Sequence, residues 1–93
     1  MEQAVKEFVK DLIIVNELGL HARAAAQIAS LAQLARSNVW IVKEGERVDA
    51  SSVIDILTLA CAKGTDISIK VDDESDLGIL NDICVLVENG FGE

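Results

Sequence analysis

The residues best suited to chemistry lie in the short run GLHAR, residues 19–23, which contains the only histidine of the chain, His21. Imidazole changes charge near neutral pH, and the lone pair of its neutral ring can attack phosphorus. Arg23, two residues further on, offers a planar fork of N–H donors that suits phosphate oxygens. This spacing indicates a histidine that accepts a phosphoryl group.

The alanine-rich stretch after His21 is predicted to form a helix over residues 22–35. Its apolar residues recur at helical spacing and would face the core: Ala25, Ile28, Ala32 and Ala35. The first turn of a helix has backbone N–H groups without partners in the helix, and it is the positive end of the helix dipole. We therefore expect the N–H groups of Ala22 and Arg23 to hold a phosphate on His21. Gly19 would let the chain turn tightly into this helix.

A plainer interpretation is that His21 only caps the helix or points into solvent. Conventional hydrolytic catalysis is disfavoured, because one histidine without a neighbouring serine, cysteine or placed carboxylate makes no triad. The chain also has no glycine-rich nucleotide loop. Cys61 and Cys84 lie far apart, with no further ligand at metal-binding spacing. We therefore expect neither a metal site, nor a disulfide, nor a cofactor.

Composition limits the classes of partner. The 93 residues, 51% of them hydrophobic, predict one globular domain over residues 1–93. The formal net charge is -8, and every charged residue from position 71 onward is acidic. Nucleic-acid binding is disfavoured, because clustered basic and stacking aromatic residues are missing. No apolar run approaches the roughly 20 residues of a membrane span, so we expect a soluble, cytoplasmic protein.

Hydrophobic periodicity predicts the order β-α-β-β-α-β-α. The expected strands cover residues 7–16, 39–42, 48–50 and 65–71, with a tight turn around Gly45. A second helix would begin at Ser52 and end at Gly64, and a last helix would follow the acidic run DDES with Leu80, Ile83 and Val87 on its core side. Short strands with one helical layer are typical of an α+β two-layer sandwich with an antiparallel sheet.

Alternation along the strands separates a face that packs on helices from an open face. The helix side would contain Phe8, Leu12, Ile14, Val39, Ile41, Ile67, Ile69 and Val71. The open face would contain Ile13, Val15, Trp40 and Val42. Such an apolar set on an exposed surface indicates self-association or a bound partner over this face.

Three stretches, GLHARAA, DASSVIDILTLACAKGTDISI and NGFGE, resemble the HPr family, the histidine-containing phosphocarrier proteins of the bacterial phosphoenolpyruvate:sugar phosphotransferase system. The resemblance covers nearly the whole chain after Phe8. It implies an open-faced sandwich with strand order 1-4-2-3 and three helices on one face. It also implies that His21 accepts a phosphoryl group on Nδ1 from enzyme I and passes it to an enzyme IIA, with Arg23 beside the phosphate.

The same resemblance implies two roles for the start of the second predicted helix. Ser52 corresponds to the regulatory serine of the family, which a kinase modifies, although serine is also a preferred helix cap. A docking surface for partner proteins would include Val53, Ile54 and Leu57. The sequence alone leaves Val53 and Leu57 open between core and surface, and it favours Ile54 as the exposed anchor.

Ala24 stands where the family motif has proline. Proline would fix φ in the first helical turn, and alanine relaxes that constraint. Two functions therefore stay open. One is a phosphoryl relay that works only with partner proteins and is no stand-alone enzyme. The other is an HPr-like regulatory adaptor that binds and controls a partner enzyme without transferring phosphate.

Overall fold

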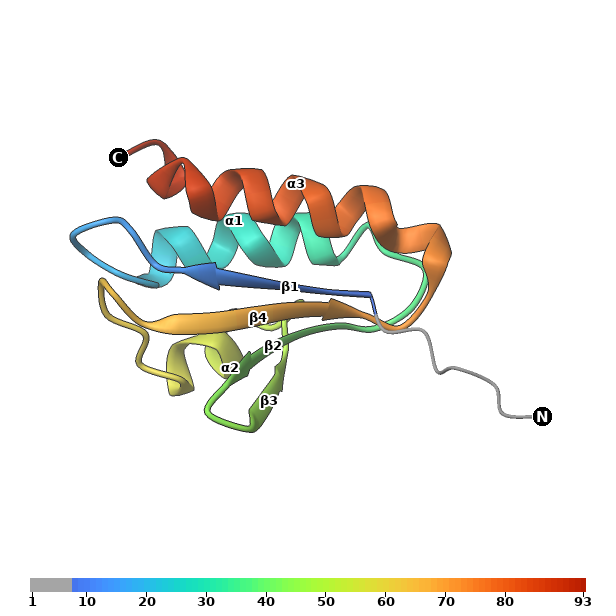
Figure 1. Cartoon of the computed structure of the whole chain (residues 1–93), viewed down its shortest axis with the longest axis horizontal. Helices are drawn as coiled ribbons and strands as arrows, with labels where there is room; N and C mark the ends of the chain where they lie inside the picture. Colours follow the sequence, from blue (N-terminus) through green and yellow to red (C-terminus); the bar gives the residue numbers. More distant parts are fainter. Residues whose placement is uncertain (1–7) are drawn as a thin grey trace.

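The computed structural model describes residues 8–93, where four antiparallel strands form one sheet in the order β1-β4-β2-β3 (Figure 1). The strands are β1 (Phe8–Ile13), β2 (Val39–Lys43), β3 (Glu46–Asp49) and β4 (Asp66–Val71). This confirms the predicted strand order. The predicted first strand extended from Glu7, which lies outside the described residues, to residue 16, whereas β1 ends at Ile13.

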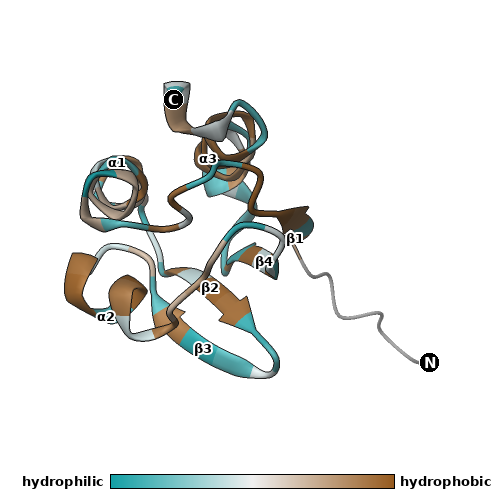
Figure 2. Cartoon of the chain, turned by 90° about the vertical axis from the view of Figure 1, so that its left-hand side faces the viewer, coloured by the Kyte–Doolittle hydropathy of each residue, from teal (hydrophilic) through white to brown (hydrophobic). Residues whose placement is uncertain are grey.

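The helices of residues 8–93 are α1 (Ala22–Ala32), α2 (Val53–Thr58) and α3 (Leu77–Glu88). Two short 3-10 turns, η1 (Glu74–Asp76) and η2 (Gly90–Gly92), lie on either side of α3. Viewed along the strands, α1, α2 and α3 lie to one side of the sheet and leave its other face open (Figure 2). The predicted α+β sandwich is confirmed.

The core lies between the sheet and the helices. Seven of the eight residues predicted to face the helices are buried, and the eighth, Phe8, is partly buried and packs against the core. The predicted core side of α3, Leu80, Ile83 and Val87, is also buried. Along α1, Ala24 and Ala29 join the predicted stripe of buried residues. Burial of aliphatic side chains is the main term that stabilises such a sandwich.

Two predicted helix ends are wrong. The first helix ends at Ala32, three residues before the predicted Ala35. The second ends at Thr58, because Ala60 adopts the left-handed φ of 51° and the helix cannot continue through it. Gly64 therefore caps no helix. Its N–H donates to the Ile14 carbonyl at 2.7 Å and joins the loop after α2 to the end of β1.

The open face holds three of the four apolar residues predicted for it, and polar groups lie among them. The fourth, Val15, follows the end of β1 and lies beside the end of α3. Ile13 is 54% exposed, and Trp40 and Val42 are half-buried. The guanidinium of Arg47 lies 4.1 Å above the Trp40 ring, and Trp40 Nε1 donates to Asp72 at 3.0 Å. No helix within residues 8–93 is long and apolar enough to cross a membrane.

Candidate functional site

His21 caps the N-terminus of α1 through its ring. The backbone at His21 is extended, and Nδ1 accepts hydrogen bonds from the N–H groups of Arg23 at 3.2 Å and Ala24 at 3.4 Å. A backbone amide can only donate, so Nδ1 must present its lone pair, and the proton of the neutral ring lies on Nε2. Both bonds are longer than the usual 2.9–3.0 Å, so the lone pair is only weakly engaged.

The loop before His21 fits only glycine at position 19. Gly19 has a φ of 66°, a left-handed conformation that side chains disfavour. A Cβ atom there would lie 2.3 Å from the carbonyl oxygen of Cys61. The same oxygen accepts a hydrogen bond from the Leu20 N–H at 2.8 Å. The chain after α2 therefore holds the His21 loop in place.

A carboxylate from the far end of the sequence completes the site. Glu93 accepts a hydrogen bond from His21 Nε2, and the same Glu93 oxygen lies 3.4 Å from an Arg23 guanidinium nitrogen. Asn16 Nδ2 donates to the other Glu93 oxygen at 3.2 Å. The hydrogen bond from His21 is the largest cause that lowers the pKa of Glu93. The His21 side chain is 23% exposed, so a partner can still reach the ring.

The turn that brings Glu93 to this place is built from left-handed residues. Gly90, Phe91 and Gly92 have φ angles of 62°, 59° and 77°. Phe91 is buried in the core although its φ is unusual for a side-chain residue. The aromatic ring therefore anchors the turn, and the two glycines on either side let the chain fold back toward His21.

Asn16 and Glu93 were missed by reasoning from the sequence. Asn16 is buried, and besides Glu93 its Nδ2 lies 2.8 Å from the Gly19 carbonyl oxygen. The run NGFG before Glu93 carried a signal, because asparagine and glycine favour tight turns and tolerate a left-handed φ. Nothing in the sequence indicated which residues that turn would meet.

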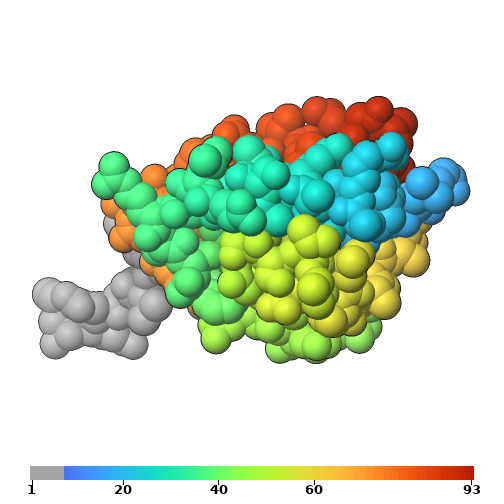
Figure 3. Space-filling model, turned by 180° about the vertical axis from the view of Figure 1, so that it is seen from behind, coloured from blue at the N-terminus to red at the C-terminus, as the bar shows by residue number. Residues whose placement is uncertain are grey.

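The structure places the residues predicted on the second helix at the surface beside α1. Ser52 is the N-cap of α2, where its Oγ accepts a hydrogen bond from the Asp55 N–H at 3.2 Å. Ile54 is 76% exposed and Leu57 is 39% exposed, whereas Val53 is partly buried against the core. Ile56 fills the core position of α2. From behind, α1 and α2 lie side by side on one face (Figure 3).

Residues 8–93 contain no group of three His, Cys, Asp or Glu side chains that could hold a metal ion. The site offers a ring nitrogen with a lone pair, an arginine and the first amides of α1.

A profile of the family described as "PTS HPr component phosphorylation site" matches residues 8–89. The chain belongs to this HPr family.

Individual HPr proteins agree with the family profile. The phosphocarrier protein HPr of Neisseria meningitidis is 36% identical over 80 residues, which covers 86% of this chain and 90% of that protein. A crystal structure of an HPr from Thermoanaerobacter tengcongensis has a TM-score of 0.86 at 28% identity and covers 91% of this chain and 96% of its own. A crystal structure of an HPr dimer from the same organism has a TM-score of 0.72 at 27% identity and covers both chains fully. These matches support an HPr phosphocarrier of the phosphotransferase system.

Proposed function

We propose that this HPr-family chain is a cytoplasmic phosphocarrier domain that takes a phosphoryl group from enzyme I onto His21 and delivers it to an enzyme IIA. The observation that carries the proposal is the orientation of the ring. Nδ1 faces the first amides of α1 with its lone pair, and Nε2–H points to Glu93. The chain is a relay that needs a donor and an acceptor protein.

In the proposed transfer, the Nδ1 lone pair attacks the phosphorus of the phosphohistidine on enzyme I. A nitrogen–phosphorus bond forms on His21 as the one on the donor breaks, and the bonding electron pair returns to the donor ring. The phosphorylated ring keeps its Nε2 proton and gains positive charge, which the Glu93 carboxylate stabilises. Transfer to the acceptor follows the same path in reverse, so no proton has to leave the site.

The phosphoryl oxygens would be bound at the N-terminus of α1. The amides of Ala22 and Arg23 lie in its first turn, and the Arg23 amide already donates to the reacting nitrogen. The side chain of Arg23 is mostly exposed, so its guanidinium is free to turn from Glu93 to the phosphate. A dianion beside Glu93 would repel the carboxylate and favour this exchange.

We assign partner docking to the exposed side chains of α2, with Ile54 and Leu57 as apolar contacts and Val53 beneath them. The chain after α2 is joined to the His21 loop by the hydrogen bond from the Leu20 N–H to the Cys61 carbonyl, and α2 packs beside α1, the helix that His21 caps. Ser52 begins α2, so a kinase that phosphorylates it would place a dianion on the docking surface.

The experiment is incubation of the chain with enzyme I and labelled phosphoenolpyruvate. The wild type should gain label that is stable to base and labile to acid, as expected for a phosphoramidate. His21→Ala should gain none, and Arg23→Ala should gain it more slowly than Arg36→Ala, a control at another exposed arginine. Label on His21→Ala would contradict the relay. A wild type that binds its partners without becoming labelled would favour the adaptor instead.

A further inference from the structure

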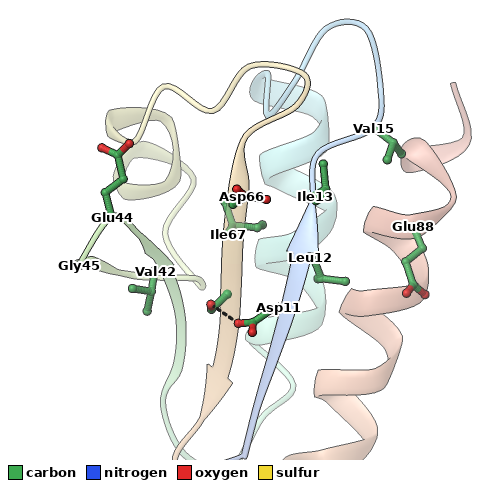
Figure 4. A pocket seen from close by; sticks show the side chains of 11 residues that line it. Asp11, Leu12, Ile13, Val15, Val42, Glu44, Gly45, Asp66, Ile67 and Glu88 are labelled. Atoms are coloured by element: carbon green, nitrogen blue, oxygen red, sulfur yellow. Dashed lines mark hydrogen bonds between the residues drawn. The ribbon is translucent and has the colours of Figure 1, made fainter.

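We propose that the open face of the sheet contains a second binding site, which takes a basic segment of a partner protein. A hollow of about 740 Å³ lies over the sheet where β1 ends and β4 begins. Figure 4 shows its borders, which are the β2–β3 turn at Glu44 and Gly45 on one side and Glu88 near the end of α3 on the other. In this view α1 and α2 lie behind the sheet, and α3 stands beside β1.

The floor of the hollow is partly apolar. Ile13 of β1 and Val42 of β2 lie on the open face, and Val15 follows β1 beside α3 (Figure 4). Ile13 and Val15 rank among the exposed large hydrophobic residues of the molecule. An aliphatic side chain of a partner that displaces water from such a surface contributes favourably to binding.

The side chains that line the hollow carry charge of one sign. Glu44 and Glu88 lie at its two borders, and Asp11 and Asp66 lie on the floor, where Asp66 pairs with Ile13 and Asp11 with Ser68. The lining contains no lysine or arginine. Asp11 accepts a hydrogen bond from Ser68 Oγ at 2.6 Å. Within residues 8–93, none of these four carboxylates takes part in a salt bridge. Four carboxylates that alternate with the aliphatic side chains of the hollow are complementary to cationic groups that flank an aliphatic side chain.

Charge also decides between the classes of occupant. A second copy of this chain would bring the same carboxylates to the face and a net charge of -8, so like charges would oppose its docking there. Lysine and arginine side chains, in contrast, can lay their methylene stems on Ile13 and Val42 while their charged ends reach the neighbouring carboxylates. A basic peptide segment therefore fits the hollow best.

The acidic lining also continues toward the phosphocarrier site. A smaller hollow shares Val15 and Glu88 with the first, and its lining includes Asn16 and Glu93. A partner that binds the open face can therefore extend a basic side chain toward the Glu93 end of the site. The proposal itself does not depend on transfer through His21.

The test is an NMR titration of the ¹⁵N-labelled chain with the synthetic peptide acetyl-KRLVKR-amide at low salt. We expect saturable shifts of the amides of Ile13, Val42 and Ser68, and no saturable shifts with the acidic peptide acetyl-EDLVDE-amide. The double variant Glu44→Gln/Asp66→Asn should bind roughly fivefold more weakly. The matched control Glu74→Gln/Asp82→Asn changes the net charge equally at exposed residues outside the hollow and should bind as the wild type does.

The apolar floor has its own control. Ile13→Ser should weaken binding of the basic peptide, whereas Val85→Ser, at a residue of α3 that is 53% exposed and outside the hollow, should not. Equal weakening by both charge pairs, or shifts scattered over the surface, would reduce the effect to general electrostatics and overturn the proposal. If spermidine binds as tightly as the peptide, the ligand is a small polyamine and not a peptide segment, which would contradict the proposal. If the same amides shift when the protein concentration alone is raised, the open face binds a second copy of the chain instead.

Discussion

At the scale of single residues, the site depends on which nitrogen of His21 carries the proton. The two first-turn amides of α1 donate to Nδ1, and Glu93 accepts from Nε2, so both neighbours select the same tautomer. That tautomer leaves the lone pair of Nδ1 at the helix N-terminus, where an anion is stabilised. In the proposed relay, Glu93 therefore positions the ring of His21 in addition to supplying its charge.

The pKa of Glu93 gives a prediction about stability. It is lowered from its usual 4.5, mainly by the hydrogen bond from His21, with Asn16 and Arg23 adding to the effect. A carboxyl with a lowered folded pKa stabilises the fold above its unfolded pKa, and this contribution is lost as the pH falls through the folded pKa. Urea unfolding of Glu93→Gln should therefore show lower stability than the wild type at neutral pH, and the two should converge in acid.

The matched control for this pH series is Glu74→Gln, at an exposed carboxyl of η1 that lies outside the His21 site. Its stability should follow that of the wild type at every pH. If the difference in the free energy of unfolding between Glu93→Gln and the wild type stays constant from neutral to acidic pH, the charge of the Glu93 carboxylate contributes nothing to stability.

Ala24 leads to a prediction about rate. Its N–H donates to His21 Nδ1 at 3.4 Å, so the donor that proline would remove points at the nitrogen that we propose accepts the phosphoryl group. Ala24→Pro should remove one of the two hydrogen bonds to the lone pair of His21 Nδ1 and fix φ near -65°. Phosphoryl transfer from enzyme I, measured by stopped flow, should therefore become a few-fold faster. Stability should change by about 1 kcal/mol or less. An unchanged or slower transfer would mean that Ala24 does not limit the site.

At the scale of elements, the loop before α1 is the part least tolerant of change. Gly19→Ala would combine a left-handed φ with a clash on the Cys61 carbonyl, and we expect a loss of roughly 3 kcal/mol in the free energy of unfolding. Gly78→Ala is the control, because Gly78 lies in α3 with open space around it and should gain roughly 0.5–1 kcal/mol. Urea denaturation measures both. Equal effects of the two substitutions would refute the tight fit at Gly19.

The start of α2 separates capping from regulation. Ser52→Ala removes the Oγ that caps α2 and should cost about 1 kcal/mol of stability. Ser52→Asp keeps an acceptor at the cap but puts a charge near Asp49 and Asp55, so it should fold normally and bind enzyme I more weakly. Isothermal titration calorimetry compares the two variants. Equal affinity of Ser52→Asp and the wild type would argue against regulation at this serine.

At the scale of the whole molecule, the fold was largely predictable because alternating aliphatic residues leave little freedom of register. Ile14, Ile41 and Ile69 each point into the core as predicted, since a shift by one residue would expose them all. Helix ends were less predictable. The end of α2 depends on the left-handed φ of Ala60, and alanine has no preference that would predict this conformation.

The candidate site was predictable only in its local half. The run GLHAR is enough to predict the local part of the site, which consists of His21, Arg23 and the first turn of α1. The contact between His21 and Glu93 spans 72 residues and arises from the turn anchored by Phe91. Such contacts follow from tertiary packing, which periodicity does not encode.

Phosphoryl transfer through Nδ1 of His21 is tested most directly by locating the phosphorus on the ring. The chain, labelled with ¹⁵N in histidine, is phosphorylated by enzyme I and phosphoenolpyruvate, and its ¹⁵N and ³¹P NMR spectra are recorded. We expect phosphorus bonded to Nδ1 of His21, with the proton retained on Nε2. Phosphorus on Nε2, or on any residue other than His21, would contradict the account.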